Sequence, residues 1–206
     1  MRKTLPILIL AAICAAPVAA APPTLTLKVA PTVVAYGGST TATGVLSTKK
    51  AGQAIDIQAQ DCGQNAFKKA ATATTTTGGA FSAAVKATIN ANYQAKNKGA
   101  TSPTVAVKVT PLLSLQKLSL GKFKVSVTAA QSFVGKYVVF QRLRNTKWVT
   151  LKKVTLATVA TTTAPTQVTT STFKIKLPAR LRVRSILPAT QAATCYLPTK
   201  SKVIRS

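Results

Sequence analysis

Apolar and polar residues alternate strictly along several stretches of the chain. In residues 122–128, Phe and Val alternate with Lys, Ser and Thr, and residues 172–177 and 181–184 repeat the pattern. A period of two is typical of a strand that is buried on one face, and the abundant Val and Thr favour strands. The sequence therefore predicts an all-β protein made of short antiparallel strands.

The two halves of the chain resemble each other. Residues 52–58 align with residues 135–141, and a Phe-led stretch at 80–85 aligns with 172–177. The second half has extra residues between Thr158 and Thr170. A repeat of about 90 residues with about seven short strands predicts two β-sandwich modules.

We place the modules at residues 21–110 and 111–206, with Val109-Thr110-Pro111 as the joint. The joint leaves almost no free linker, so we expect the modules to abut.

Four motifs carry a resemblance to a known family. They are Tyr36-Gly37-Gly38, Gly52-x-x-Ile55-x-Ile57, Thr77-Gly78-Gly79-Ala80-Phe81 and Asn92-Tyr93-Gln94-Ala95. They resemble bacterial immunoglobulin-like repeats, which recur in secreted and cell-surface proteins, and the second half looks like a diverged copy. The resemblance implies two tandem immunoglobulin-like antiparallel β-sandwich domains, similar to fibronectin type III modules, that serve as spacers or in adhesion. It carries over no ligand residue.

Residues 1–20 have the pattern of a secretory signal peptide. Arg2 and Lys3 precede an apolar stretch at 5–16, and Val18 and Ala20 supply small residues for cleavage after Ala20. The apolar stretch is shorter than the roughly 20 residues of a transmembrane helix, which argues against the alternative of an uncleaved anchor. We expect a secreted, extracellular or envelope-associated protein with no transmembrane span in the mature chain.

Basic residues far outnumber acidic ones, with 28 Lys plus Arg against two Asp. Residues 21–110 hold nine Lys and both Asp, whereas residues 111–206 hold 17 Lys plus Arg and no acidic side chain. Such an imbalance attracts polyanions without determining the fold.

The basic residues of the second half are the strongest functional signal. Lys122 and Lys124 on one strand should share an outer face with the lysines of residues 172–177, while the arginines of residues 180–184 should alternate on the other sheet. We predict a polyanion-binding surface made of Lys122, Lys124, Arg142, Arg144, Lys174, Lys176, Arg180, Arg182, Arg184, Lys200 and Lys202.

The expected partner is an anionic cell-wall or extracellular polymer, meaning a polysaccharide, a phosphate polymer or DNA, bound non-specifically through Lys and Arg. Trp148, Tyr137 and Tyr196 are expected in the core or at the joint. Few aromatic side chains would then remain for base stacking, which argues against a dedicated nucleic-acid reader.

Cys62 and Cys195 are the two cysteines of the expected mature chain. In a sandwich, Cys62 would lie in a turn that faces the second module, and Cys195 in a turn that faces the first. We predict a disulfide across the joint, which export permits. The alternative is two free or intermolecular thiols.

Catalytic chemistry has little support in the sequence. The chain contains no His, and Asp56 and Asp61 should face opposite sides of a strand, where they could not act as a pair. Ser-x-x-Lys spacings occur, for example at Ser119 and Lys122, but i and i+3 diverge on a strand. We expect no enzyme, no cofactor and no metal site. The Thr-rich stretches at 72–77 and 161–172 suit solvated edges or loops.

Two functions from different classes remain. The first is a non-enzymatic secreted or envelope-associated module that attaches electrostatically to anionic polymers or mediates adhesion. The alternative is a structural spacer with no dedicated ligand, whose charge serves solubility only.

Overall fold

The structure is a computed structural model that describes residues 21–160, 162–192 and 194–206. The expected signal peptide at residues 1–20 lies outside the described residues. Within them the regular structure is almost entirely strand, with one helix of four residues, so the predicted all-β class is confirmed. No helix in the described part of the chain is long and apolar enough to cross a membrane.

The first half of the chain contributes two sheets. The β3 sheet has the order β1-β3-β6, and the β7 sheet has the order β2-β9-β7-β4-β5 with β8 paired to β7. Strand β2 runs parallel to β9, and the other pairs are antiparallel. The strands are β1 (Lys28–Ala30), β2 (Val33–Ala35), β3 (Ser39–Val45), β4 (Ala54–Asp61), β5 (Lys68–Thr74), β6 (Ala80–Lys86), β7 (Ala91–Asn97), β8 (Ala100–Thr101) and β9 (Val105–Thr110).

The second half contributes two more sheets, both antiparallel. The β11 sheet has the order β10-β11-β15-β14, and the β12 sheet has the order β13-β12-β16-β17 with β18 paired to β16. The elements are β10 (Leu112–Ser119), β11 (Lys122–Ala129), β12 (Tyr137–Arg144), β13 (Lys147–Thr155), β14 (Thr158–Ala160), β15 (Gln167–Lys174), β16 (Arg182–Leu187), α1 (Ala189–Ala192), β17 (Thr199–Lys200) and β18 (Ile204–Arg205).

The alternating stretches form strands of the expected kind. In β11, Phe123, Val125 and Val127 are fully buried while Lys122 and the intervening polar residues face outward. Phe123 packs against Phe140 and Phe173, with ring centroids 5.1 and 5.7 Å apart. The core of the second half therefore lies between the β11 and β12 sheets.

Two details of the strand prediction are wrong. Strand β15 ends at Lys174 rather than at residue 177, because its neighbour β11 begins at Lys122 and only the Gly121 carbonyl remains to accept a bond from Ile175 N. Arg180 does not lie on a strand either. It occupies a turn with a left-handed φ of 67°, two residues before β16 begins.

The Thr-rich stretches are also less exposed than expected. Thr169 is fully buried in β15, which lies between β11 and β14, and its Oγ1 accepts a hydrogen bond from Phe133 N at 2.9 Å. Thr75 is likewise buried, and its Oγ1 donates to Lys50 O. Satisfied hydroxyls let these two threonines replace apolar residues in the interior.

The aligned stretches of the two halves adopt equivalent geometry. Gly52 and Gly135 both have positive φ, near 75° and 80°, and each donates its N–H across the sheet, to Thr75 O and Leu156 O respectively. The register also shifts at matching places, between Ile57 and Gln58 in β4 and between Phe140 and Gln141 in β12. The sequence alignment of residues 52–58 with 135–141 thus corresponds to a shared backbone path.

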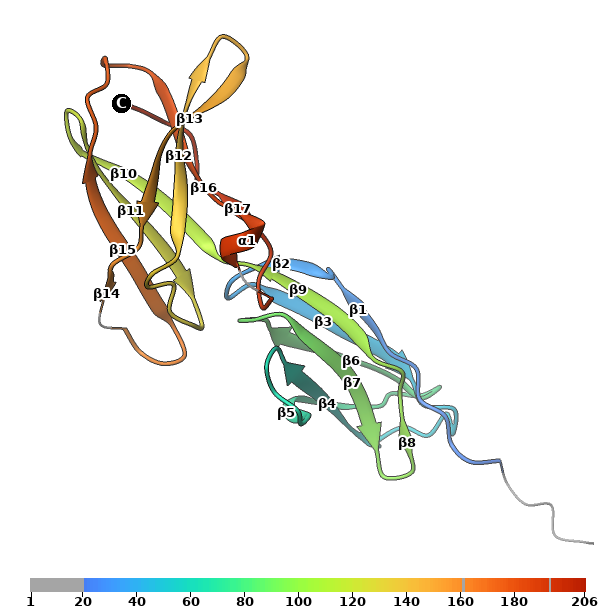
Figure 1. Ribbon diagram of the computed structural model, residues 1–206. Helices are drawn as coiled ribbons and strands as arrows, with labels where there is room; N and C mark the ends of the chain where they lie inside the picture. Colours follow the sequence, from blue (N-terminus) through green and yellow to red (C-terminus); the bar gives the residue numbers. More distant parts are fainter. Residues whose placement is uncertain (1–20, 161, 193) are drawn as a thin grey trace, which may run out of the picture.

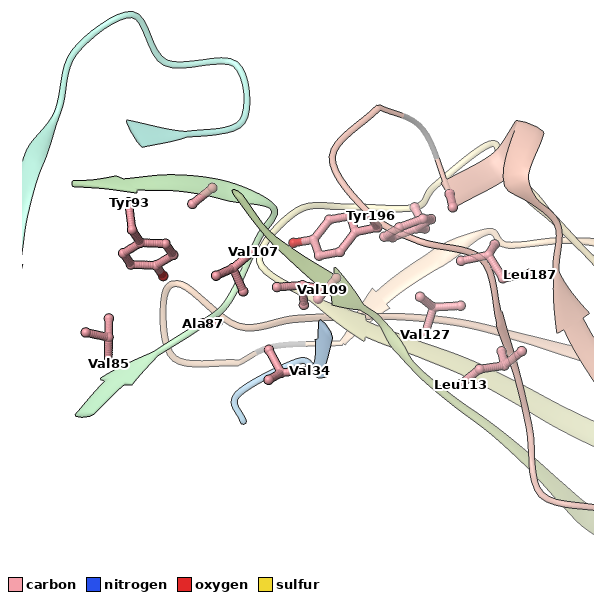
Figure 2. Close-up of a cluster of buried hydrophobic side chains, with 14 of the residues drawn as sticks. Val34, Val85, Ala87, Tyr93, Val107, Val109, Leu113, Val127, Leu187 and Tyr196 are labelled. Atoms are coloured by element: carbon pink, nitrogen blue, oxygen red, sulfur yellow. The ribbon is translucent and has the colours of Figure 1, made fainter. Parts of the chain in front are cut away.

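The two halves meet around Pro111, which alone separates β9 from β10. Figure 2 shows the buried side chains at this boundary, where Val107 and Val109 of β9 lie near Tyr196, Leu187 and Val127 of the second half. The buried residues of both halves belong to one continuous cluster. The joint is therefore packed rather than open.

Candidate anion-binding surfaces

The outer face of the β11 sheet carries a group of lysines. Lys122 of β11 lies directly opposite Lys174 of β15, and both side chains are exposed. Lys124 occupies the next outward position of β11, opposite Thr172. Lys176 lies beyond the end of β15 and lines the same groove as Lys122 and Lys174. The structure thus brings together the four lysines that the sequence grouped.

The outer face of the β12 sheet carries a second group, made of arginines. Arg182 and Arg184 take alternate outward positions on β16. Arg205 of β18 lies directly opposite Arg182, although the sequence prediction did not include it. Lys200 of β17 lies farther along the same face, opposite Ile186, and Lys202 is exposed just beyond that strand.

Arg142 and Arg144 do not join this face. Arg142 lies opposite Val183, whose side chain is fully buried, so it points to the inner side of the sheet. Its Nε atom is buried and has no hydrogen-bond partner among the described residues. Arg144 is exposed at the end of β12 and lines a pocket with Arg142 and Leu181. The residues of the predicted polyanion-binding surface therefore do not form one surface. Most lie on the outer faces of two different sheets, and Arg142 points inward.

Trp148 accompanies the arginine group, which corrects the expectation that it lies in the core or joint, whereas Tyr137 lies beside a lysine of β13. The guanidinium of Arg184 lies over the Trp148 ring, 4.0 Å from its centroid, and Arg184 Nε donates to Gln141 Oε1 at 3.0 Å. Lys153 Nζ lies 5.0 Å from the centroid of Tyr137. Trp148 and Tyr137 are only half-buried.

A register shift explains the position of Trp148. Lys152 pairs with Phe140 but Thr150 pairs with Gln141, so Leu151 is an extra residue in β13. A bulge of this kind reverses the facing of every residue beyond it. Without it, the strand period would turn Trp148 toward the core.

Partial burial lowers the pKa of Arg184, yet an arginine remains charged in neutral solution.

The two carboxylates lie on opposite faces of the β7 sheet. Asp56 lies opposite Lys96 and forms an ion pair with Lys69 Nζ at 2.7 Å. The hydrogen bond and charge of Lys69 lower the pKa of Asp56. Asp61 lies opposite the buried Ala91, at the end of β4 that faces the joint. The two carboxylates therefore do not face each other.

One Ser–Lys spacing differs from expectation. Ser119 and Lys122 are paired across the β10–β11 hairpin, so they do not diverge as residues on one strand would. Both side chains line the same groove. Among residues 21–160, 162–192 and 194–206, no cluster of three His, Cys, Asp or Glu side chains could hold a metal ion.

Cys62 and Cys195 form a disulfide between the two halves. The sulfur atoms lie 2.10 Å apart and the Cα atoms 5.3 Å apart, across 133 positions in sequence. Cys62 follows β4, and Cys195 lies between α1 and β17. Both connections face the joint, as the sandwich topology predicted.

Asn90 makes the polar contacts beside the disulfide. Its backbone O accepts from Cys62 N at 2.8 Å, and its backbone N donates to Cys195 O at 3.1 Å. Its side chain donates to Thr194 O at 3.2 Å and accepts from Val109 N at 2.7 Å. Sequence reasoning missed Asn90, because a lone Asn before a strand gives no sign of such partners.

Tyr196 lies at the joint, one of the two places expected for it, and its hydroxyl links the two halves. The hydroxyl donates to Thr88 O at 3.0 Å and accepts from Ala130 N at 2.9 Å. Burial raises the pKa of Tyr196 to about 12. The neutral phenol is therefore the form that the joint holds.

Comparison of the chain with protein-family models and with curated proteins finds no match.

Proposed function

We propose that the chain is an exported, non-enzymatic module of two tandem immunoglobulin-like β-sandwiches that attaches electrostatically to an anionic polymer of the cell envelope or its surroundings. The ligand class is a polysaccharide, a phosphate polymer or DNA, held by charge rather than by sequence.

The observation that carries this proposal is the placement of like charges directly opposite each other. Lys122 faces Lys174 on one outer face, and Arg182 faces Arg205 on the other. Like charges at paired positions of a sheet are destabilising. Residues 111–206 contain no acidic side chain that could offset the repulsion. A bound polyanion would relieve it on both faces.

The arginine face has features suited to anionic groups. A guanidinium grips phosphate or carboxylate through two parallel hydrogen bonds. Trp148 stacks under Arg184 and holds it in place. An ordered arginine loses less side-chain entropy when it binds than a mobile one does.

The order of the strands supports the immunoglobulin-like part of the proposal. In that fold, one sheet contains strands A, B, E and D, and the other contains C, F and G. The orders β10-β11-β15-β14 and β13-β12-β16-β17 fit this arrangement, with β13 as an added edge strand. In the first half, β1-β3-β6 and β2-β9-β7-β4-β5 fit it with the first strand split between sheets.

Export is supported by the pattern of residues 1–20 and by the disulfide. Disulfides persist in oxidising compartments and are rare in reducing ones. An adhesive or wall-attached role outside the cytoplasm suits both features.

The direct test measures binding of the mature protein to heparin, polyphosphate and double-stranded DNA over a range of salt. We expect log affinity to fall linearly with log salt. Replacing Lys174, Lys176, Arg182 and Arg184 by Gln should weaken binding and reduce the slope by about three to four.

A matched control removes four charges elsewhere. Lys28, Lys50, Lys68 and Lys98 are exposed in the first half, and their replacement by Gln should leave most of the binding and slope intact. Equal losses of polymer affinity in the two variants would show that net charge, rather than the position of the charges, determines binding. Absence of binding at physiological salt would contradict the proposal.

The spacer alternative is favoured by a different observation. The disulfide, the Asn90 contacts and the packed boundary fix the two halves to each other, as a rigid spacer requires. A spacer would bind none of the polymers, and the charge variants would change only solubility.

A further inference from the structure

The β10–β11 hairpin exposes two leucines at its tip. We call residues 118–121 the leucine tip. Leu118 is 49% exposed and Leu120 is 69% exposed. Leu118 lies in a register shift between Lys117 and Ser119, and Gly121 closes the turn with φ near 70°. Two exposed leucines on one tight turn would gain free energy if an apolar phase or molecule covered them.

An open groove lies beside the leucine tip. Its volume is about 860 Å³, and its apolar lining comes from Leu120, Ile175, Leu177 and Pro178. Lys122, Lys174 and Lys176 line the same groove, and all three are exposed. Apolar lining beside ammonium groups complements an anionic amphiphile.

The leucine tip lies at the end of the second half that is far from the joint (Figure 1). Strand β10 starts at Leu112, next to Pro111, and its eight residues carry the chain about 25 Å to the tip. Further cations lie at this end, where Figure 1 shows the β12–β13 hairpin, which carries Arg144, and the segment before β16, which carries Arg180. The end is thus apolar at its tip and cationic around it.

We propose that this end binds the surface of an anionic lipid bilayer, with Leu118 and Leu120 inserted below the headgroups and the surrounding Lys and Arg on lipid phosphates. The proposal goes beyond electrostatic polymer attachment, because it assigns the apolar side chains a ligand that a soluble polyanion does not supply. Insertion and charge together make the two signals that stable surface binding requires.

The charge of this end argues against a second copy of the chain as the occupant. Pairing two such ends would bring together Lys and Arg clusters with no acidic side chain in residues 111–206. A bilayer with anionic headgroups covers the leucines and neutralises the cations at the same time.

The test is sedimentation with vesicles of phosphatidylcholine alone or mixed with phosphatidylglycerol. We expect the wild-type protein to bind the mixed vesicles and to bind phosphatidylcholine weakly. Replacing Leu118 and Leu120 by Ser should lower partitioning onto mixed vesicles by about tenfold or more, since burial of each leucine is lost. Binding of the same variant to soluble polyphosphate should be unchanged.

A matched control removes two exposed apolar side chains near the joint. Leu112 is 46% exposed and Val134 is 49% exposed, and replacing both by Ser should leave vesicle binding unchanged. In a separate variant, Leu120→Trp, the added tryptophan fluorescence should shift to the blue on mixed vesicles.

Several outcomes would overturn the inference. Equal partitioning of the wild-type protein and the Leu118/Leu120 variant would exclude insertion. Binding of the wild-type protein to polyphosphate but not to vesicles would identify a soluble polymer as the ligand and leave the proposed function intact. Loss of both vesicle and polymer binding in a folded leucine variant would assign the tip to polymer binding instead.

Discussion

Asn90 connects the two halves through hydrogen bonds of both its backbone and its side chain. It is 6% exposed, and its amide side chain satisfies one group on each side of the joint, Val109 N and Thr194 O. A buried polar group that loses its partner costs its full desolvation energy. We therefore expect the side chain of Asn90 to contribute measurably to the free energy of unfolding.

Replacing Asn90 by Ala should lower the free energy of unfolding by about 1–3 kcal/mol, because Val109 N and Thr194 O would lose their partner. Chemical denaturation measures the change. Asn92→Ala is the control, since Asn92 is exposed in β7, two residues after Asn90, and its effect should stay within about 0.5 kcal/mol. Similar losses in the two variants would mean that the Asn90 contacts contribute little.

Tyr196 gives the joint a pH dependence at high pH. The folded pKa of about 12 lies above the ordinary value of 10.0, because burial disfavours the phenolate. The stabilisation is therefore fully present below pH 10 and is lost as pH rises toward 12. We expect the unfolding free energy to fall across this interval.

Tyr196→Phe provides the comparison. The variant cannot ionise at this position, so its stability should decline less between pH 10 and 12, although it starts lower because Ala130 N loses a partner. Denaturation measured at several pH values distinguishes the two proteins. Parallel pH profiles would mean that Tyr93, whose pKa burial also raises, accounts for the decline instead.

At the scale of elements, the sequence predicted what depends on local period. Strand β11 and the end of β15, residues 172–174, follow from alternation, since a half-buried strand needs an apolar residue at every second position. The alignment of Gly52 with Gly135 follows because both turns require positive φ, which glycine adopts without strain. These features are encoded within a few neighbouring residues.

What the sequence could not predict depends on pairing between strands. The bulge at Leu151 carries no local sign, yet it turns Trp148 outward under Arg184. Arg142 turns inward on the side of Val138 and Phe140, but the apolar run from Tyr137 to Phe140 does not show which side is buried until its pairing with β16 is known. Arg205 joins the arginine face only because β18 pairs with β16. Each of these positions follows from long-range register.

At the scale of the whole molecule, the cationic surfaces and the rigid joint lie in different places. The cations of the second half spread over its outer faces and its far end, whereas the disulfide, Asn90 and Tyr196 hold the joint. On the proposals above, an anionic surface bound by the second half would fix the direction in which the first half projects. The joint then matters for function as well as for stability.

The disulfide is the covalent part of the joint. Replacing Cys62 and Cys195 by Ser should lower the free energy of unfolding by up to about 4–5 kcal/mol, because the bond closes a long loop in the unfolded chain. Chemical denaturation of the variant and of the reduced wild-type protein should give matching losses. The strands should persist in the circular dichroism spectrum, since each sheet draws its strands from one half. Two free thiols in the exported protein, found by alkylation and intact mass, would show that the bridge does not form.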